Sequence, residues 1–336
     1  MSSNTKKAFW EDSTKGLGQV KDSDDFLHPE LSKSEPGHAL TETQYMGFNI
    51  PEHNIHGLGY LWYHPNLKTV MGGIAVWQGF KRHPLESEIW DYVNYMSDDC
   101  LKDDLWKYRL ENGYTVSTIK PLASHRIQYE SKATDSFVDV SYEALMPPAM
   151  YGSGMHFEQG MKTSGEVRLR GKTYAVNGMT IRDRSFGQLR REYLVSLPPL
   201  AWINGAFSDK FVFGCMVFDD PKHHPEWAGK FDLPNNNPLR EGWVYKDGIQ
   251  SQMVKVSKLT TRKPGTFYAD RVEMTIEDAL GRTFEITGQS IAGVNWQTWQ
   301  NMDSNVNLMR WECNGEVTHG DYQEFLWPEY VRQFHP

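Results

Sequence analysis

The sequence predicts an all-β protein made of two tandem antiparallel barrels or sandwiches with a short helical insertion. From Tyr45 onward, short runs of alternating polar and apolar residues are separated by Gly, Pro, Asn and Asp, which is typical of strands and turns. Trp, Tyr and Phe, which favour strands, number 12, 16 and 16. With 336 residues, the chain is long for one hydrophobic core and sufficient for two domains.

The domain organisation follows from changes in composition along the chain. Residues 1–40 are polar and lack a sustained period, so we expect a loosely packed N-terminal arm without chemistry. The segment LPPLAW, at Pro198 and Pro199, separates two sets of strands of similar length. We therefore place an N-terminal domain at residues 41–195 and a C-terminal domain at residues 196–336.

One segment interrupts the strand pattern, and another is a clear hairpin. Residues 84–110 carry apolar side chains at helix-like spacing, which predicts a short helix across one end of a barrel: Ile89, Tyr92, Val93 and Met96. Residues 272–288 contain two alternating runs joined by a turn, which predicts a β-hairpin.

The stretch Gly165–Leu189 predicts three strands joined by two turns. Gly171-Lys172 can turn the chain, and Asn177-Gly178 is a strong hairpin signal. The third run ends in Asp-Arg-Ser at residues 183–185. This polar strand end indicates either a functional site or an ion pair that ties the strand to a neighbouring loop.

Charge and composition exclude several classes of partner. Lys and Arg total 35 against 43 Asp and Glu, so a net charge of −8 disfavours nucleic acid and anionic membranes. No apolar run suits a secretory signal or a membrane span. Cys100, Cys215 and Cys313 are far apart and odd in number, which favours reduced thiols and a cytoplasmic location.

Neither nucleotide cofactors nor serine hydrolase chemistry is indicated. The glycine-containing strings GMTIRDRSFG and GGIAVWQG have no phosphate-loop or dinucleotide fingerprint. There is no G-x-S-x-G elbow, and Ser185 has no evident general-base partner. We therefore expect no cofactor.

Asp183 is the candidate acid for an acid/base reaction. Hydration of an unactivated alkene requires an acid that protonates carbon, an aromatic wall facing the developing cation, and a positioned water. Burial would raise the pKa of Asp183, whereas the charge of Arg184 would lower it. Adjacent strand residues point to opposite faces, so the two side chains need not share a cavity. Asp183 could thus act as an acid, a ligand clamp or a structural ion-pair partner.

His156 and Glu158 are the other candidate catalytic residues. Strand alternation puts both on one face, with Phe157 on the other. They form an acid/base pair, a polar clamp or a solvated strand face.

His53 and His56 do not predict a metal site. Pro51 and nearby glycines disfavour the helix that would bring the two imidazoles together, and no H-E-x-x-H motif is present. We expect a polar patch at the mouth of the first barrel, with Tyr60 and Trp62 pointing the same way along their strand.

Several of these motifs together resemble the carotenoid 1,2-hydratase family, which includes AttH-like proteins, kievitone hydratase and lipocalin-type Diels-Alderases. The resemblance rests on these motifs: G-x-V-x-L-x-G-x-x-Y-x-V-x-G from Gly165, DRSFG at 183–187, GWVYKDG at 242–248, RWE at 310–312 and GDYQE at 320–324. The resemblance implies two tandem lipocalin-like β domains. The sequence departs from the family's D-H-x-W-G string, because Arg184 and Phe186 replace the His and the Trp.

The resemblance and the aromatic content imply a cofactor-independent enzyme on a hydrophobic small molecule. A hydratase, or a related lyase or isomerase, of a terpenoid, steroid or polyphenol-like alkene is the leading expectation. A non-catalytic carrier and a pericyclase are the alternatives, and a homodimer is left open. We expect the ligand to contact these residues: Arg184, Ser185, Tyr60, Trp62, His53, Trp202, Trp311, Glu312 and Tyr322.

Overall fold

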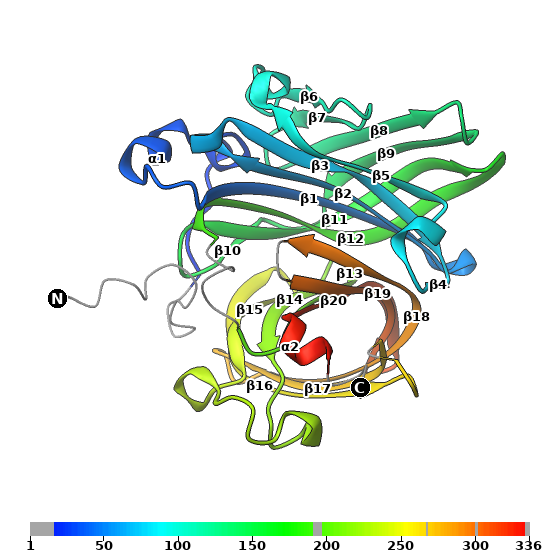
Figure 1. Ribbon diagram of the computed structural model, residues 1–336. Helices are drawn as coiled ribbons and strands as arrows, with labels where there is room; N and C mark the ends of the chain where they lie inside the picture. Colours follow the sequence, from blue (N-terminus) through cyan, green and yellow to red (C-terminus); the bar gives the residue numbers. More distant parts are fainter. Residues whose placement is uncertain (1–16, 191–196, 267, 300–301, 333–336) are drawn as a thin grey trace. The chain divides into compact units, whose positions relative to one another are not determined.

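The computed structural model describes residues 17–190, 197–266, 268–299 and 302–332, and it divides the chain into two compact units (Figure 1). Unit 1 comprises Gly18–Gln78 and Ser87–Arg190. Unit 2 comprises Gly79–Glu86 and the chain after Arg190. The predicted domain boundary between 195 and 196 lies outside the described residues.

Unit 1 is a curled antiparallel sheet with the strand order β5-β3-β2-β1-β12-β11-β9-β8-β7-β6, and β10 pairs with β11 (Figure 1). Its strands are β1 (Leu40–Ile50), β2 (Ile55–His64), β3 (Thr69–Gln78), β5 (Ile89–Ser97), β6 (Lys107–Arg109), β7 (Thr115–Lys120), β8 (Ser124–Ser131), β9 (Ser136–Ala144), β10 (Ala149–Met150), β11 (His156–Leu169) and β12 (Lys172–Leu189). Its single-turn 3₁₀ segments include η2 (Pro51–His53), η3 (Pro65–Leu67) and η5 (Asp98–Leu101). The prediction of an all-β fold is confirmed.

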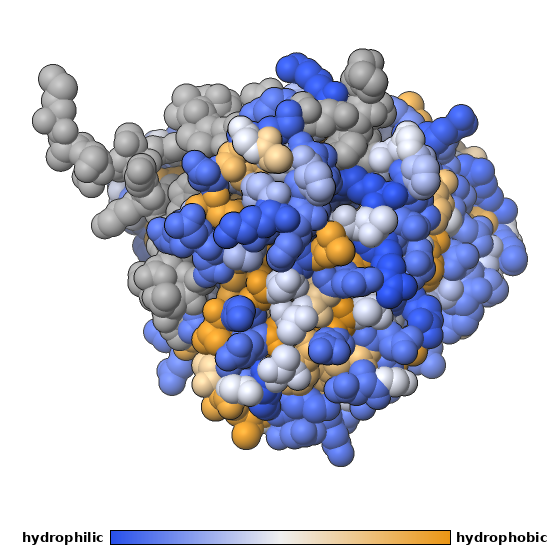
Figure 2. All heavy atoms as spheres, turned by 90° about the horizontal axis from the view of Figure 1, so that it is seen from below, coloured by the Kyte–Doolittle hydropathy of each residue, from blue (hydrophilic) through white to orange (hydrophobic). Residues whose placement is uncertain are grey.

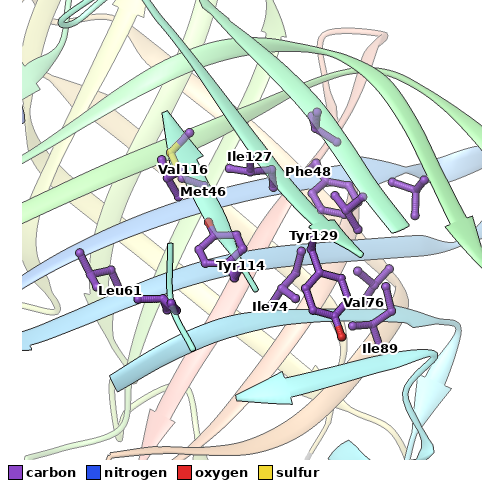
Figure 3. Packing of buried hydrophobic residues seen from close by; sticks show 14 of the residues in the cluster. Met46, Phe48, Leu61, Ile74, Val76, Ile89, Tyr114, Val116, Ile127 and Tyr129 are labelled. Carbon is purple, nitrogen blue, oxygen red and sulfur yellow. The ribbon is translucent and has the colours of Figure 1, made fainter. Parts of the chain in front are cut away.

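The core of unit 1 lies on the concave side of this sheet (Figure 3). Figure 3 shows side chains from β1, β2, β3, β5, β7 and β8 pointing toward one another. The side chain of Tyr114 packs against β2 at Gly59, where an added Cβ would lie 1.9 Å from the Tyr114 hydroxyl. The labelled core residues are Met46, Phe48, Leu61, Ile74, Val76, Ile89, Tyr114, Val116, Ile127 and Tyr129.

The helix predicted within residues 84–110 is wrong, because the apolar residues there belong to strand β5. Val70 pairs with Met96 and Gly72 pairs with Val93, so β5 holds one residue more than β3 between these pairs. This β-bulge, where Tyr95 has a φ of 60°, lengthens the strand's period of two to a spacing of three. A bulged strand therefore imitates helical periodicity in the sequence.

The predicted turn at Asn177-Gly178 is also wrong, because β12 continues through it to Leu189. The chain turns once, at Arg170-Gly171, and Leu169 pairs with Lys172. Gly178 instead lies under Asn49, whose side-chain oxygen would be 3.3 Å from an added Cβ. Residues 183–185 consequently lie inside a long strand rather than at its end.

The prediction of a loose N-terminal arm is wrong for residues 22–34, which we call the strap. The strap contains the 3₁₀ turn η1 (Asp22–Asp25) and the helix α1 (Pro29–Ser34). Asp25 is fully buried, and the ring of Phe26 packs 4.6 Å from that of Trp106. Buried polar contacts, rather than apolar periodicity, fix this segment.

Unit 2 is a barrel, closed by pairing of β17 with β18. The order is β17-β16-β15-β14-β13-β20-β19-β18, β17 also pairs with β18, and β4 (Phe80–Lys81) adds a parallel strand to β18. Its other strands are β13 (Leu200–Ser208), β14 (Phe211–Phe218), β15 (Leu239–Lys246), β16 (Ile249–Arg262), β17 (Ala269–Asp278), β18 (Thr283–Trp299), β19 (Met302–Cys313) and β20 (Glu316–Leu326). Its helical segments are η4 (Pro84–Glu86), η6 (Pro225–Trp227), η7 (Pro234–Asn236) and α2 (Pro328–Val331).

The predicted hairpin at residues 272–288 is confirmed as β17 and β18, with Glu277 paired to Thr283. Alternate residues of β17 are buried and exposed, as expected of a strand with one face on a core.

Figure 2 shows a face of the molecule on which hydrophobic residues form small patches among hydrophilic ones. None of the helices in the described part of the chain has the length and apolar character needed to cross a membrane.

Candidate functional site

The strand register brings six of the predicted site residues to one face of unit 1. Directly paired residues of adjacent strands share a face, and two such rows cross β2, β1, β12 and β11. The first row is Tyr60, Tyr45, Asp183 and Glu158, and the second is Trp62, Thr43, Ser185 and His156. The core residues Met46 and Leu61 point to the opposite face. We call the residues of these two rows, together with Tyr151, the outer-face cluster.

His156 is held between a hydroxyl and a carboxylate. Its Nδ1 lies 2.7 Å from the Oγ of Ser185, and its Nε2 lies 3.3 Å from Oε1 of Glu158. Tyr151 stacks on the imidazole and donates its hydroxyl to the same Glu158 oxygen over 2.8 Å. All four side chains are buried, so these contacts fix the ring of His156 in one orientation.

The expectation that Ser185 lacks a general-base partner is therefore wrong. His156 and Ser185 are 29 positions apart and meet because β11 and β12 pair in that register. With Nε2 donating to Glu158, Nδ1 accepts a hydrogen bond from the Ser185 hydroxyl.

Asp183 is the half-buried carboxyl of the cluster, and it accepts no hydrogen bond from any residue that the structure describes. Burial raises the pKa of Asp183 to about 6. The charge of His156 opposes this rise, and the carboxylate of Glu158, directly across from it, adds to it. A carboxyl group in this state can donate a proton near neutral pH.

Tyrosine rings flank Asp183 on the strand side away from β11. Tyr45 pairs directly with Asp183, and Tyr60 pairs with Tyr45, with ring centroids 6.5 Å apart and planes at 63°. The hydroxyl of Tyr45 extends over Gly47, where an added Cβ would lie 2.8 Å away. The faces of such rings favour a nearby positive charge.

Arg184 points to the opposite face of the sheet from Asp183. Its guanidinium is fully buried and bonds Glu42 together with the carbonyl oxygens of Thr43, Ser185 and Phe26. Burial alone would raise the pKa of Glu42, but the charge of Arg184 holds it below its usual range. Both terminal nitrogens of Arg184 therefore have partners within the protein.

The predicted residues of unit 2 do not form one group. Trp311 is a core residue that fits over Gly288, where an added Cβ would lie 2.2 Å from its ring, and Glu312 is exposed beside Arg310. Trp202 is buried on the outer face of the barrel, directly paired with Gln323.

Tyr322 belongs to a buried polar network inside the barrel. Its hydroxyl lies 2.8 Å from Thr260 Oγ1, 3.2 Å from Glu324 and 3.3 Å from Lys258. Lys258 is in turn paired with Asp219, and Glu324 receives two 2.8 Å bonds from Arg262. Burial would raise the pKa of Asp219, but the charges of Lys258, His224 and Arg262 outweigh it and hold the pKa well below its usual range.

His53 lies apart from the outer-face cluster. It is exposed at the end of η2 and packs edge-on against Tyr174, with ring centroids 4.9 Å apart. His56 packs against Trp77. Across the described ranges, no three His, Cys, Asp or Glu side chains gather in a way that could hold a metal ion.

Sequence reasoning missed Tyr45, Tyr151 and Asp25. Tyr45 joins the site through pairing of β1 with β12, which no local pattern reveals. Tyr151 precedes β11 in a Pro- and Gly-containing loop, and its spacing of five from His156 gives no strand signal. Asp25 is separated from its partner Arg182 by 157 positions.

Comparison with known proteins identifies a family and two similar structures. Residues 21–329 match the family described as domain of unknown function DUF7064, and no curated protein matches the sequence. An AttH-like protein from Nitrosomonas europaea superposes with a TM-score of 0.61 at 11% identity, over 94% of this chain and 98% of that one. Kievitone hydratase from Nectria haematococca gives a TM-score of 0.53 at 11% identity, over 95% of this chain and 99% of that one.

At such identity the likeness concerns the fold. It confirms the resemblance to AttH-like proteins and kievitone hydratase that the motifs predicted, and with it the tandem lipocalin-like architecture. Because the family match covers residues 21–329, which is most of the chain, the chain belongs to the DUF7064 family.

Proposed function

We propose that the protein is a cofactor-independent hydratase, or a related lyase or isomerase, that acts on the alkene of a hydrophobic small molecule. One observation carries this proposal. Asp183, a half-buried carboxyl without a hydrogen-bond donor among the described residues, stands in a row between Tyr45 and the Glu158–His156 pair. The fold likeness to kievitone hydratase supports the same reaction class.

In this mechanism Asp183 is the general acid. Its carboxyl group transfers a proton to one alkene carbon, and the other carbon becomes a carbocation facing Tyr45 and Tyr60. A water molecule adds to the cation through its oxygen and gives a protonated alcohol. That oxygen then loses a proton to the His156–Glu158 pair, and passage of this proton to Asp183 restores the starting state.

The buried contacts of His156 suit the base role. Ser185 and Tyr151 hold the imidazole and the Glu158 carboxylate in place, so the proton acceptor is oriented before the substrate arrives. Burial of the cluster also keeps competing water away from the cation.

The test is incorporation of heavy oxygen. Purified protein is incubated with a panel of prenylated, terpenoid and steroid alkenes in ¹⁸O-labelled water, and products are analysed by mass spectrometry. We expect a labelled alcohol with the native protein and a loss of at least about 100-fold in rate with Asp183→Asn, which retains shape but cannot donate the proton.

Two outcomes would contradict the proposal. Equal turnover by Asp183→Asn would exclude Asp183 as the acid. Tight binding of panel members without turnover by the native protein would favour a carrier instead.

A further inference from the structure

The two arginines that flank Asp183 in sequence are both held by the strap. Arg182 donates to Oδ1 of Asp25 over 2.6 Å and to Oδ2 over 3.3 Å. Arg184 donates to the carbonyl oxygen of Phe26 over 2.7 Å. Residues 25 and 26 therefore bond to the neighbours of Asp183 on both sides.

The same contacts connect β12 to β11 at the level of the carboxyl pair. Gln159 Oε1 accepts hydrogen bonds from Nε and Nη2 of Arg182, at 3.0 and 2.8 Å. Gln159 and Arg182 are directly paired across the strands, next to the pair of Glu158 and Asp183. These hydrogen bonds lie on the inner face of the sheet, which is the face opposite the outer-face cluster. They hold β11 and β12 together at the level where Asp183 and Glu158 are paired.

The charges of Asp25 and Arg182 also compensate each other. Both side chains are fully buried, and Asp25 additionally accepts the amide hydrogen of Leu122 over 2.5 Å. His125 lies 3.6 Å from Asp25, and burial lowers the pKa of His125 to about 3, so the imidazole is uncharged at neutral pH. The positive charge of Arg182 is therefore compensated by Asp25.

We propose that the strap, through Asp25 as a positioning residue, holds Asp183 opposite Glu158 and cancels the charge of Arg182 behind it. This role rests on the proposed function, in which Asp183 is the acid. Without Asp25, an uncompensated guanidinium would stand one residue from the acid and favour its ionised form. Without Arg182, an uncompensated Asp25 would do the opposite.

Other charges near Asp183 stay the same in both variants. His156 and Glu158 face it from β11, and Tyr45 faces it from β1. Arg184 on β12 and Arg190, just beyond the end of that strand, also contribute. The sign of each expected shift therefore depends only on the charge that is removed.

The experiment measures the titration of Asp183 without using catalysis. The free energy of unfolding is measured from pH 4 to pH 8 in the full chain and in Asp183→Asn, and their difference is fitted with the unfolded-state pKa held at 3.8, which gives the midpoint at which residue 183 titrates in the folded protein. In the parent this midpoint is expected near pH 6. The same pair is then compared in three backgrounds: Asp25→Asn, Arg182→Gln and the double variant.

We expect Asp25→Asn to lower the midpoint by roughly 0.5 to 1 pH unit and Arg182→Gln to raise it by a similar amount. The double variant, which is neutral again, is expected to return the midpoint toward that of the parent. Asp139→Asn is the matched control, because it removes a carboxylate from the partly exposed pair with Arg126. It should leave the midpoint unchanged.

An unchanged midpoint in any folded single variant would overturn the proposal. If Asp25→Asn does not fold, Arg182→Gln decides the matter by the opposite shift. Where alkenes are hydrated, the limb of the pH–rate profile in which the rate falls as Asp183 loses its proton should move in the same direction as the midpoint. Shifted midpoints without hydration of any substrate would sustain the role of the strap and refute the hydratase.

Discussion

Replacement of Asp183 by asparagine is expected to stabilise the protein at high pH and not at low pH. The unfolded chain releases the Asp183 proton near the ordinary value of 3.8, whereas burial raises the pKa of the folded form to about 6. The folded state binds this proton more tightly. Its contribution to stability is therefore complete below pH 3.8 and is lost as the pH rises through 6.

The size of the effect follows from the same two values. A difference of about two pKa units corresponds to about 3 kcal/mol between the two ends of the pH range. Since Asp183 is half-buried, solvent reduces this figure, and we take it as an upper bound. The asparagine side chain of the variant stays neutral throughout, so its free energy of unfolding should exceed that of the native protein above about pH 7.

Urea unfolding at one-unit steps from pH 4 to pH 8 provides the measurement. The difference between the two proteins should grow between about pH 4 and pH 6.5 and then level off. The reasoning would be refuted by a difference that is constant across the range, since a solvated carboxyl titrates alike in both states. A difference that falls with pH would mean that the folded state stabilises the carboxylate.

Three further predictions concern other parts of the molecule. Lys258→Met should lower the free energy of unfolding by about 3 to 5 kcal/mol because it leaves Asp219 buried without its lysine, and Lys258→Met with Asp219→Asn should recover much of the loss in urea titrations. Gly288→Ala should destabilise unit 2 by about 1 to 3 kcal/mol, because the new methyl group would collide with Trp311. Calorimetry measures this as a lower unfolding temperature, and an unchanged unfolding temperature would contradict the packing described for Trp311. His156→Gln should reduce the rate of alkene hydration by about 100-fold or more, whereas Tyr151→Phe, which keeps the stacked ring, should reduce it less, and equal rates for all three proteins would exclude His156 as the base.

The sequence predicted features that depend on local alternation. A period of two is enough to put His156 and Glu158 on one face, to put Tyr60 with Trp62, and to separate Arg184 from Asp183. Over β5, the apolar spacing instead predicted a false helix, because a bulge at Tyr95 changes the period. Local pattern thus indicated the face of each side chain and failed where the backbone is irregular.

Features that depend on strand pairing could not be predicted. The contact of His156 with Ser185, and the position of Tyr45 beside Asp183, arise from register between β11, β12 and β1. The partnership of Asp25 with Arg182 crosses 157 positions and comes from a segment whose composition predicts a loosely packed arm. A polar segment can be ordered by one buried ion pair, which composition does not reveal.

The charges on the inner face explain why Asp183 keeps a raised pKa although an arginine stands on each side of it. Each guanidinium points to the inner face and meets a carboxylate there, Arg182 with Asp25 and Arg184 with Glu42. The inner face of β12 therefore carries little net charge near Asp183.

The outer face holds two carboxyl groups and one imidazole. Glu158 accepts the Tyr151 hydroxyl and lies beside His156, which leaves Asp183 as the carboxyl without a donor among the described residues. Burial and the adjacent carboxylate of Glu158 both raise the pKa of Asp183, which reaches about 6. The position of the acid therefore depends on neutrality of the opposite face, to which the strap contributes Asp25.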